Sequence, residues 1–220
     1  MNLFIIGNGF DKEHGLATSY VDFRNFLENE DWAYLADFEA LYGFTVDSER
    51  GFVEDYLWQE FESKLSAIND GQMIDNGKYI DMGLDGGDIA IEDTLDSYWE
   101  DQYGYITRLN DFVKLWIEQI DIKVPKKAKM IKPYSKDLFI SFNYTLLLEK
   151  IYHVDQWNIL HIHGSIDESN YSPVVGHGDR VMADEARENA KRAGEEMLEK
   201  ESSIYNAFAN YLDRTFKDVN

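Results

Sequence analysis

Three short apolar runs in the sequence each end in glycine or polar residues. They cover residues 2–6, 138–142 and 158–162. A strand buried inside a parallel sheet is typically a continuous apolar run bounded by turn residues. Each run therefore predicts such a strand, and the apolar pair Val174-Val175 is a candidate for the start of a fourth.

Segments with helical periodicity lie between these runs. Apolar residues recur at spacings of three and four over about 20–27, 52–68 and 103–121, which is typical of amphipathic helices. Thr18 or Ser19 can cap the first of these helices, because a hydroxyl at that position accepts from the free backbone N–H groups of the first turn. Strands that alternate with helices in this way predict an α/β fold with a mostly parallel sheet flanked by helices.

The length of 220 residues is that of one α/β domain covering residues 1–220. Glycine, aspartate and asparagine interrupt the pattern over residues 69–102, which we interpret as an acidic insertion. After residue 183 the chain consists mainly of helix formers of mixed charge. Because few strands precede this end, the prediction leaves open a domain that is incomplete at its C-terminus.

The formal net charge is −21, and most of it falls within residues 1–123. Such a charge repels phosphates, so direct binding to nucleic acid or to an anionic membrane is disfavoured. Six lysines lie over residues 123–136. They form either a solvated linker or a surface that meets a phosphate or an acidic partner.

Cysteine is absent, which excludes disulfides, thiol catalysis and cysteine-ligated zinc. The first residues lack a basic region, and their apolar run is too short for a signal peptide or a membrane span. These features predict a cytoplasmic protein.

The three strand ends carry the candidate chemistry. Residues 7–11 read Gly-Asn-Gly-Phe-Asp directly after the first run. A strand that ends in Gly-x-Gly is typical of a phosphate-binding turn, where glycine permits positive φ and the close approach of a pyrophosphate. Residues 141–145 and 161–165 follow the other two runs. Because the carboxyl ends of parallel strands line one crevice, we expect these segments to converge.

Asn143 and two histidines are the candidate reactive residues. Asn143 either caps a helix that begins near Thr145 or uses its amide to hold a ribose hydroxyl or a water. His161 and His163 would share one face of a strand. No third ligand stands at a convincing spacing, so no metal site is predicted. Either histidine can be a buried structural residue, but His163 stands before a glycine at a strand end and is better placed for catalysis.

These segments, in this order, resemble the AbiH family of bacterial abortive-infection (phage-resistance) proteins. The likeness extends over residues 3–178, with the acidic segment as a variable insertion. The motifs that carry it are residues 4–11, 14–16, 18–23, 58–62, 141–145, 160–164 and 176–178. The resemblance implies a role in phage defence, with a phage protein as a candidate trigger.

A more distant likeness relates the chain to sirtuins and sirtuin-like NAD hydrolases, whose motifs include a Gly-x-Gly turn, an asparagine after a strand and a His-Gly pair. It implies a Rossmann-like fold that binds NAD as ligand or substrate, without a metal. Asn143 would orient a water or the nicotinamide ribose, and His163 would act as general base. The implied nucleotide-binding residues are Gly7, Asn8, Gly9, Phe10, Asp11, Thr145 and Gly164.

Two departures from the sirtuin-like pattern matter. Asp11 stands where that pattern has serine, and its negative charge would oppose a pyrophosphate unless Asp11 faces a ribose or is paired. The later glycine-serine strand of the pattern does not occur before Asn220. The leading hypothesis is hydrolysis of NAD or a related nucleotide. The alternative is a non-catalytic module that senses a nucleotide or a phage protein by association.

Overall fold

The computed structural model describes residues 1–68, 97, 99–100, 104–134, 136–167, 172–178, 180–196 and 198–217. Within these residues the chain packs as two compact units. Unit 1 contains Met1–Glu30 and Asn110–Val175, and unit 2 contains Asp31–Leu109 and Gly176–Asp218. Most of the acidic insertion predicted at 69–102 lies outside the described residues. The single domain over 1–220 stays a prediction.

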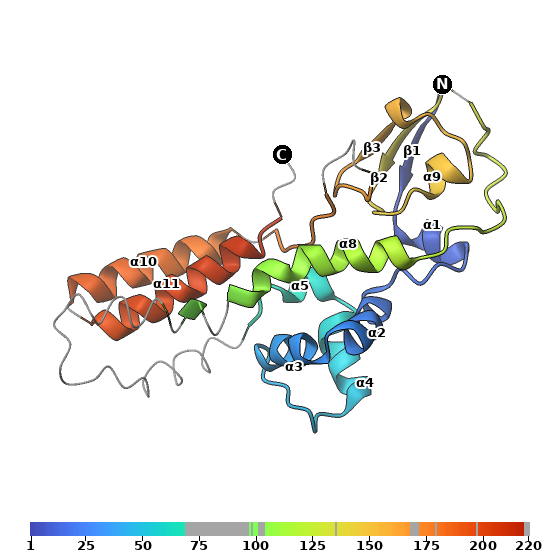
Figure 1. The fold of residues 1–220 in the computed structure, drawn as a ribbon. Helices are drawn as coiled ribbons and strands as arrows, with labels where there is room; N and C mark the ends of the chain where they lie inside the picture. Colours follow the sequence, from blue (N-terminus) through green and yellow to red (C-terminus); the bar gives the residue numbers. More distant parts are fainter. Residues whose placement is uncertain are drawn as a thin grey trace. The chain divides into compact units, whose positions relative to one another are not determined.

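Unit 1 is built on a three-stranded parallel sheet (Figure 1). Its strands are β1 (Leu3–Ile6), β2 (Leu138–Ser141) and β3 (Ile159–His161), in the spatial order β1-β2-β3. The three strands predicted from the apolar runs, and the α/β class, are thereby confirmed. Val174 and Val175 lie outside any strand, so the fourth predicted strand is wrong.

One face of this sheet carries the core of unit 1. Phe4 pairs with Phe139 across the two strands, and their rings stack at a centroid distance of 5.1 Å. The short helix α9 (Leu147–Lys150) lies in the connection from β2 to β3. It adds Leu148 to the same cluster. The buried members of the cluster are Ile6, Ile131, Phe139, Leu148, Tyr152 and Val154.

The opposite face of the sheet is apolar and exposed. Leu3, Ile5 and Leu160 are 59%, 68% and 57% exposed, although parallel sheets usually bury both faces. Right-handed crossovers between strands in the order 1-2-3 place both connections on the same face. This topology explains why one face has a packed core and the other does not.

The remaining helices of unit 1 lie at the ends of the first connection. They are α1 (Asn8–Glu13), α2 (Tyr20–Glu30) and α8 (Leu109–Gln119), with a 3₁₀ turn at Gln156–Asn158 before β3. Ser19 caps α2 as predicted. Its Oγ accepts from the N–H of Asp22 at 3.2 Å, while the Asp22 carboxylate accepts from the N–H of Ser19 at 2.9 Å. Phe23 packs on Trp116 of α8 at 5.1 Å between ring centroids.

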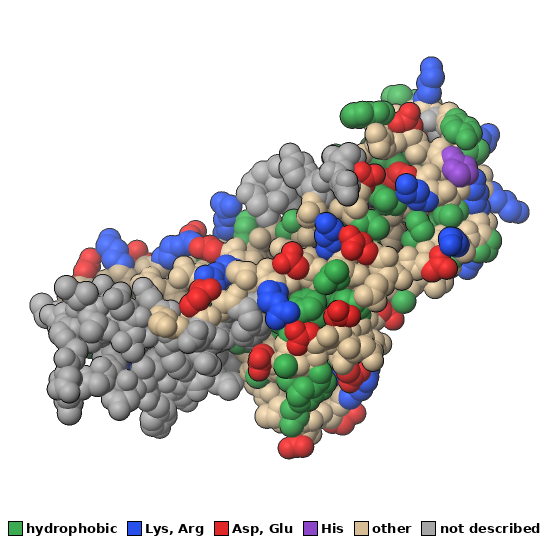
Figure 2. Space-filling view, in the orientation of Figure 1, with side chains coloured by type: hydrophobic (Ala, Val, Ile, Leu, Met, Phe, Trp, Pro, Cys, Tyr) green, Lys and Arg blue, Asp and Glu red, His purple; other side chains and the backbone are tan. Residues whose placement is uncertain are grey.

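Unit 2 is helical in its described residues. Its helices are α3 (Trp32–Ala40), α4 (Arg50–Val53), a π-helix (Glu54–Trp58), α5 (Phe61–Lys64), a 3₁₀ helix (Gly104–Arg108), α10 (Val181–Glu195) and α11 (Glu199–Arg214). The helix predicted over 52–68 is therefore interrupted by a π turn. On the face shown in Figure 2, acidic and basic side chains are interspersed over the described surface.

Aromatic packing and one buried hydrogen bond stabilise the first half of unit 2. The rings of Trp58 and Phe61 stack at 4.8 Å, and Phe38 packs against both. The indole N–H of Trp58 donates to Oε1 of Glu39 at 2.7 Å. Trp58 is fully buried and Glu39 nearly so, so this bond satisfies a carboxylate that has little access to water.

Candidate functional site

The carboxyl ends of the three strands lie side by side. Ile6 pairs with Ser141, and Ser141 pairs with His161, so the segments after each strand leave the sheet at the same edge. The amide Nδ2 of Asn143 donates to Oδ1 of Asp11 at 2.8 Å. The structure thus brings together Asp11 and Asn143, the polar residues that follow β1 and β2.

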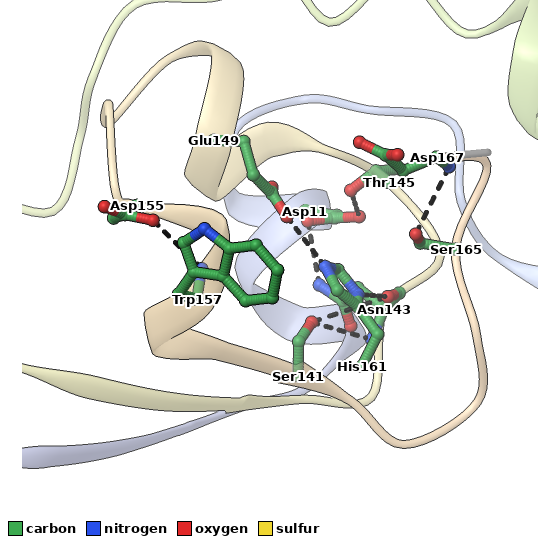
Figure 3. A network of polar contacts seen from close by, with 10 residues as sticks. All are labelled: Asp11, Ser141, Asn143, Thr145, Glu149, Asp155, Trp157, His161, Ser165 and Asp167. Carbon is green, nitrogen blue, oxygen red and sulfur yellow. Dashed lines mark hydrogen bonds and ion pairs between the residues drawn. The ribbon is translucent and has the colours of Figure 1, made fainter. Parts of the chain in front are cut away.

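Asp11 is the centre of a polar network (Figure 3). Its carboxylate accepts from Asn143 through Oδ1 and, through Oδ2, from the Thr145 hydroxyl at 2.6 Å. The side chain is 1% exposed. Burial raises the pKa of Asp11, and the hydrogen bonds from Thr145 and Asn143 lower it less, so the pKa stays above its ordinary value. Both oxygens of Asp11 therefore accept from neutral donors, which satisfies the carboxylate but does not neutralise its charge.

Asn143 has one polar atom that is buried and unsatisfied. It is buried, and its Oδ1 has no hydrogen-bond partner among the described residues. Helix α9 is preceded by Leu146, with no side-chain cap, so the alternative that Asn143 caps this helix is wrong. The hydroxyl of Thr145, a predicted nucleotide-binding residue, donates to Asp11.

His161 belongs to the network, and sequence reasoning did not give it that place. Its Nδ1 lies 3.0 Å from the backbone carbonyl oxygen of Asn143, and its Nε2 lies 2.8 Å from Oε1 of Glu149 (Figure 3). Burial lowers the pKa of His161, but the hydrogen bond and the charge of Glu149 raise it more, so the pKa is raised overall. Glu149, on α9, was not a candidate from sequence. The one signal was a lone acid after three leucines.

His163 lies in the turn after β3. Its ring packs edge-on against Phe142 at 5.3 Å and lies 6.4 Å from the ring of Tyr144. Because β3 ends at His161, the expectation that both histidines share one strand face is wrong. Gly164 adopts φ +75, a left-handed conformation that favours glycine. The catalytic assignment of His163 stays a prediction.

The glycine turn differs from its expected conformation. Gly7 precedes α1 with φ −120 and Gly9 lies inside α1, so the prediction of positive φ there is wrong. The other reason for glycine, close approach of a pyrophosphate, agrees better with the structure. A Cβ built on Gly7 or Gly9 would meet no described atom within 4 Å, so the space above this backbone is open. Positive φ occurs instead at Gly15, after α1.

Two other side chains predicted to bind the nucleotide, those of Asn8 and Phe10, contact residues of unit 1 instead. The Asn8 amide donates to the carbonyl of Thr18 at 2.7 Å and accepts from its hydroxyl at 2.6 Å. The ring of Phe10 packs on His14 and Tyr152 at 4.6 and 5.5 Å. These contacts fix the turn to the rest of the unit, so any nucleotide would meet mainly its backbone.

Two of the three histidines without a predicted role, His14 and His177, are buried. His14 contacts the Phe10 carbonyl at 2.7 Å and the Tyr152 hydroxyl at 2.6 Å, and His177 contacts the Leu212 carbonyl at 3.0 Å. In the described part of the chain no group of three or more metal-ligating side chains could hold an ion. Nor is any helix there both long and apolar enough to cross a bilayer.

Comparison with known protein families assigns the chain. Residues 3–219 match the family model for bacteriophage abortive infection, AbiH. The chain belongs to the AbiH family. The resemblance drawn from the motifs is thereby confirmed, and membership implies a role in abortive-infection defence against bacteriophage. No curated protein and no solved structure matches the chain, and the Rossmann-like and sirtuin-like assignments stay predictions.

Proposed function

We propose that this AbiH protein acts in phage defence by binding a nucleotide, NAD or a relative of it, at the carboxyl edge of the sheet and hydrolysing it. The observation that carries the proposal is the position of Asn143. This residue sits where the strand ends converge, its Nδ2 is held by Asp11, and its Oδ1 still requires a donor. A ribose hydroxyl is such a donor.

The open backbone at Gly7 and Gly9 supports a place for the phosphates. Without a Cβ, a pyrophosphate can approach the main chain at Gly7 and Gly9 closely. The carboxylate of Asp11 accepts from Asn143 and Thr145, so both of its oxygens already have donors without the ligand.

The chemistry would be displacement at the ribose carbon that bears nicotinamide. Water adds to that carbon as the C–N bond breaks, and nicotinamide leaves with the bonding electrons. His163 would accept the proton that the water loses, and Asn143 would orient the water or the ribose. The products are nicotinamide and ADP-ribose.

A second candidate function is sensing without turnover. It is favoured by one observation: Asp11, Thr145 and His161 are buried and already bonded within the network. Groups held in this way can transmit the presence of a ligand without reacting with it. A nucleotide or a phage protein would then act as the signal.

Incubation of the purified protein with NAD, with detection of nicotinamide, tests hydrolysis. We expect release by the wild type, loss in His163→Ala and Asn143→Ala, and no change in Glu118→Gln, an exposed control on α8. Equal nicotinamide release by His163→Ala and the wild type would refute the catalytic role. Thermal-shift titration with NAD, ADP-ribose and ATP separates the two candidates, because a sensor is stabilised by its ligand without consuming it.

A further inference from the structure

His161 lies between two hydrogen-bond acceptors. Its Nδ1 faces the backbone carbonyl of Asn143 at 3.0 Å, and its Nε2 faces Oε1 of Glu149 at 2.8 Å. A carbonyl oxygen can only accept, so Nδ1 carries a proton. An ionised carboxylate can also only accept, so Nε2 carries one as well. A histidine with both ring nitrogens protonated is an imidazolium.

We propose that His161 is a buried imidazolium, paired with Glu149, that positions Asn143 for the ligand of the carboxyl-edge site. The ligand part of this inference rests on the proposed function; the charge of His161 and its hold on Asn143 do not. His161 is a positioning residue, because its two N–H groups donate to Asn143 and Glu149 and neither is left for a ligand.

The surroundings of His161 favour its charged form. The carboxylates that interact with it come from three segments: Glu149 on α9, Asp11 on α1 and Asp167 in the loop after β3. The side chains of His161 and Glu149 are 2% and 13% exposed, so water screens their attraction weakly. The net upward shift of the pKa of His161 agrees with this arrangement.

Asn143 is held at two separate points. Asp11 accepts from its side-chain Nδ2, and His161 donates to its backbone carbonyl. These contacts fix both the main chain and the amide plane, and they leave Oδ1 as the side-chain atom of Asn143 without a partner among the described residues. If His161 loses a proton, one of its two hydrogen bonds is lost, and Asn143 or Glu149 is released. Ligand affinity should then fall as the pH rises through the titration of His161.

Nuclear magnetic resonance of the wild-type protein tests the charge directly. The chain has five histidines, and His161→Gln identifies the signals of His161. We expect ring-nitrogen shifts of a doubly protonated imidazole at about pH 7, with deprotonation above the ordinary pKa of histidine. We also expect the side-chain amide signals of Asn143 to move with the same titration. A neutral His161 at that pH, or Asn143 signals that ignore its titration, would overturn the inference.

Glu149→Gln tests the ion pair. We expect it to lower the pKa of His161 and to weaken ADP-ribose binding roughly tenfold, measured by calorimetry. Glu149→Asp should recover part of both, and Glu118→Gln should change neither. An unchanged pKa of His161 in folded Glu149→Gln contradicts the pairing. If wild type binds no nucleotide, the proposed function fails, whereas the wild-type resonance data still decide the state of His161 and its hold on Asn143, even if Glu149→Gln does not fold.

Discussion

Replacing Asp11 with alanine tests whether the polar network stabilises unit 1. Asp11 is 1% exposed and accepts from Asn143 at 2.8 Å and from Thr145 at 2.6 Å. Asp11→Ala removes the acceptor for both groups, and both are buried. The connection between α1 and the segment after β2 then loses its side-chain hydrogen bonds to Asp11.

The expected cost follows from these two donors. A buried donor left without an acceptor costs about 1 to 3 kcal/mol. The cost is partly offset because the variant no longer buries a carboxylate, whose desolvation raises the pKa of Asp11 in the native protein. We therefore expect Asp11→Ala to lower the free energy of unfolding by about 2 to 4 kcal/mol.

Urea unfolding, combined with hydrogen exchange of the β1 and β2 amides, provides the assay, because exchange reports on unit 1 separately. Glu118→Gln on the exposed face of α8 is the control and should change stability by less than about 0.5 kcal/mol. Unfolding of Asp11→Ala that equals wild type within that margin would refute the reasoning. So would a loss confined to amides of unit 2.

Three further predictions concern other parts of the chain. Gly9→Ala should leave stability unchanged or raise it by up to about 1 kcal/mol, since Gly9 is helical and its Cβ meets open space; a marked loss in thermal unfolding would contradict this. Trp58→Phe should cost about 1 to 3 kcal/mol, because the carboxylate of Glu39 loses its indole donor; unfolding like wild type would count against that bond. The pKa of His161 is raised in the folded protein. Its protonation should therefore stabilise the fold at a pH below the ordinary pKa of histidine, and this stability should be lost as the pH rises through the raised pKa. The stability difference between wild type and His161→Gln should therefore shrink as the pH rises above the ordinary pKa of histidine, and a constant difference would exclude the linkage.

The strands could be predicted from sequence because each is a short, continuous apolar run that ends in glycine or polar residues. Ser19, one of the two candidate caps, likewise predicts the start of α2, since capping is a local interaction. The fourth strand predicted at Val174 and Val175 is wrong because apolar character alone does not supply a neighbouring strand to pair with. Their N–H groups donate to the His163 carbonyl and to the Asn110 side chain, which holds them in a loop.

The site could be predicted only in part. The meeting of Asp11 and Asn143 follows from parallel strands whose carboxyl ends share one edge. Which of His161 and His163 joins the polar network does not follow from the sequence, because it depends on where β3 ends. The contact of Glu149 with His161 depends on how α9 packs over the strand ends, which no local pattern encodes.

The central claim is that the carboxyl edge of the sheet binds a nucleotide. Calorimetric titration of wild type, Gly9→Ala and Asn143→Ala with ADP-ribose tests it most directly, with Glu118→Gln as control. The account predicts saturable binding to wild type and control, and clearly weaker binding to both variants while Gly9→Ala stays fully folded. Absence of binding to wild type would contradict it. So would folded Gly9→Ala and Asn143→Ala variants that bind ADP-ribose as tightly as wild type does.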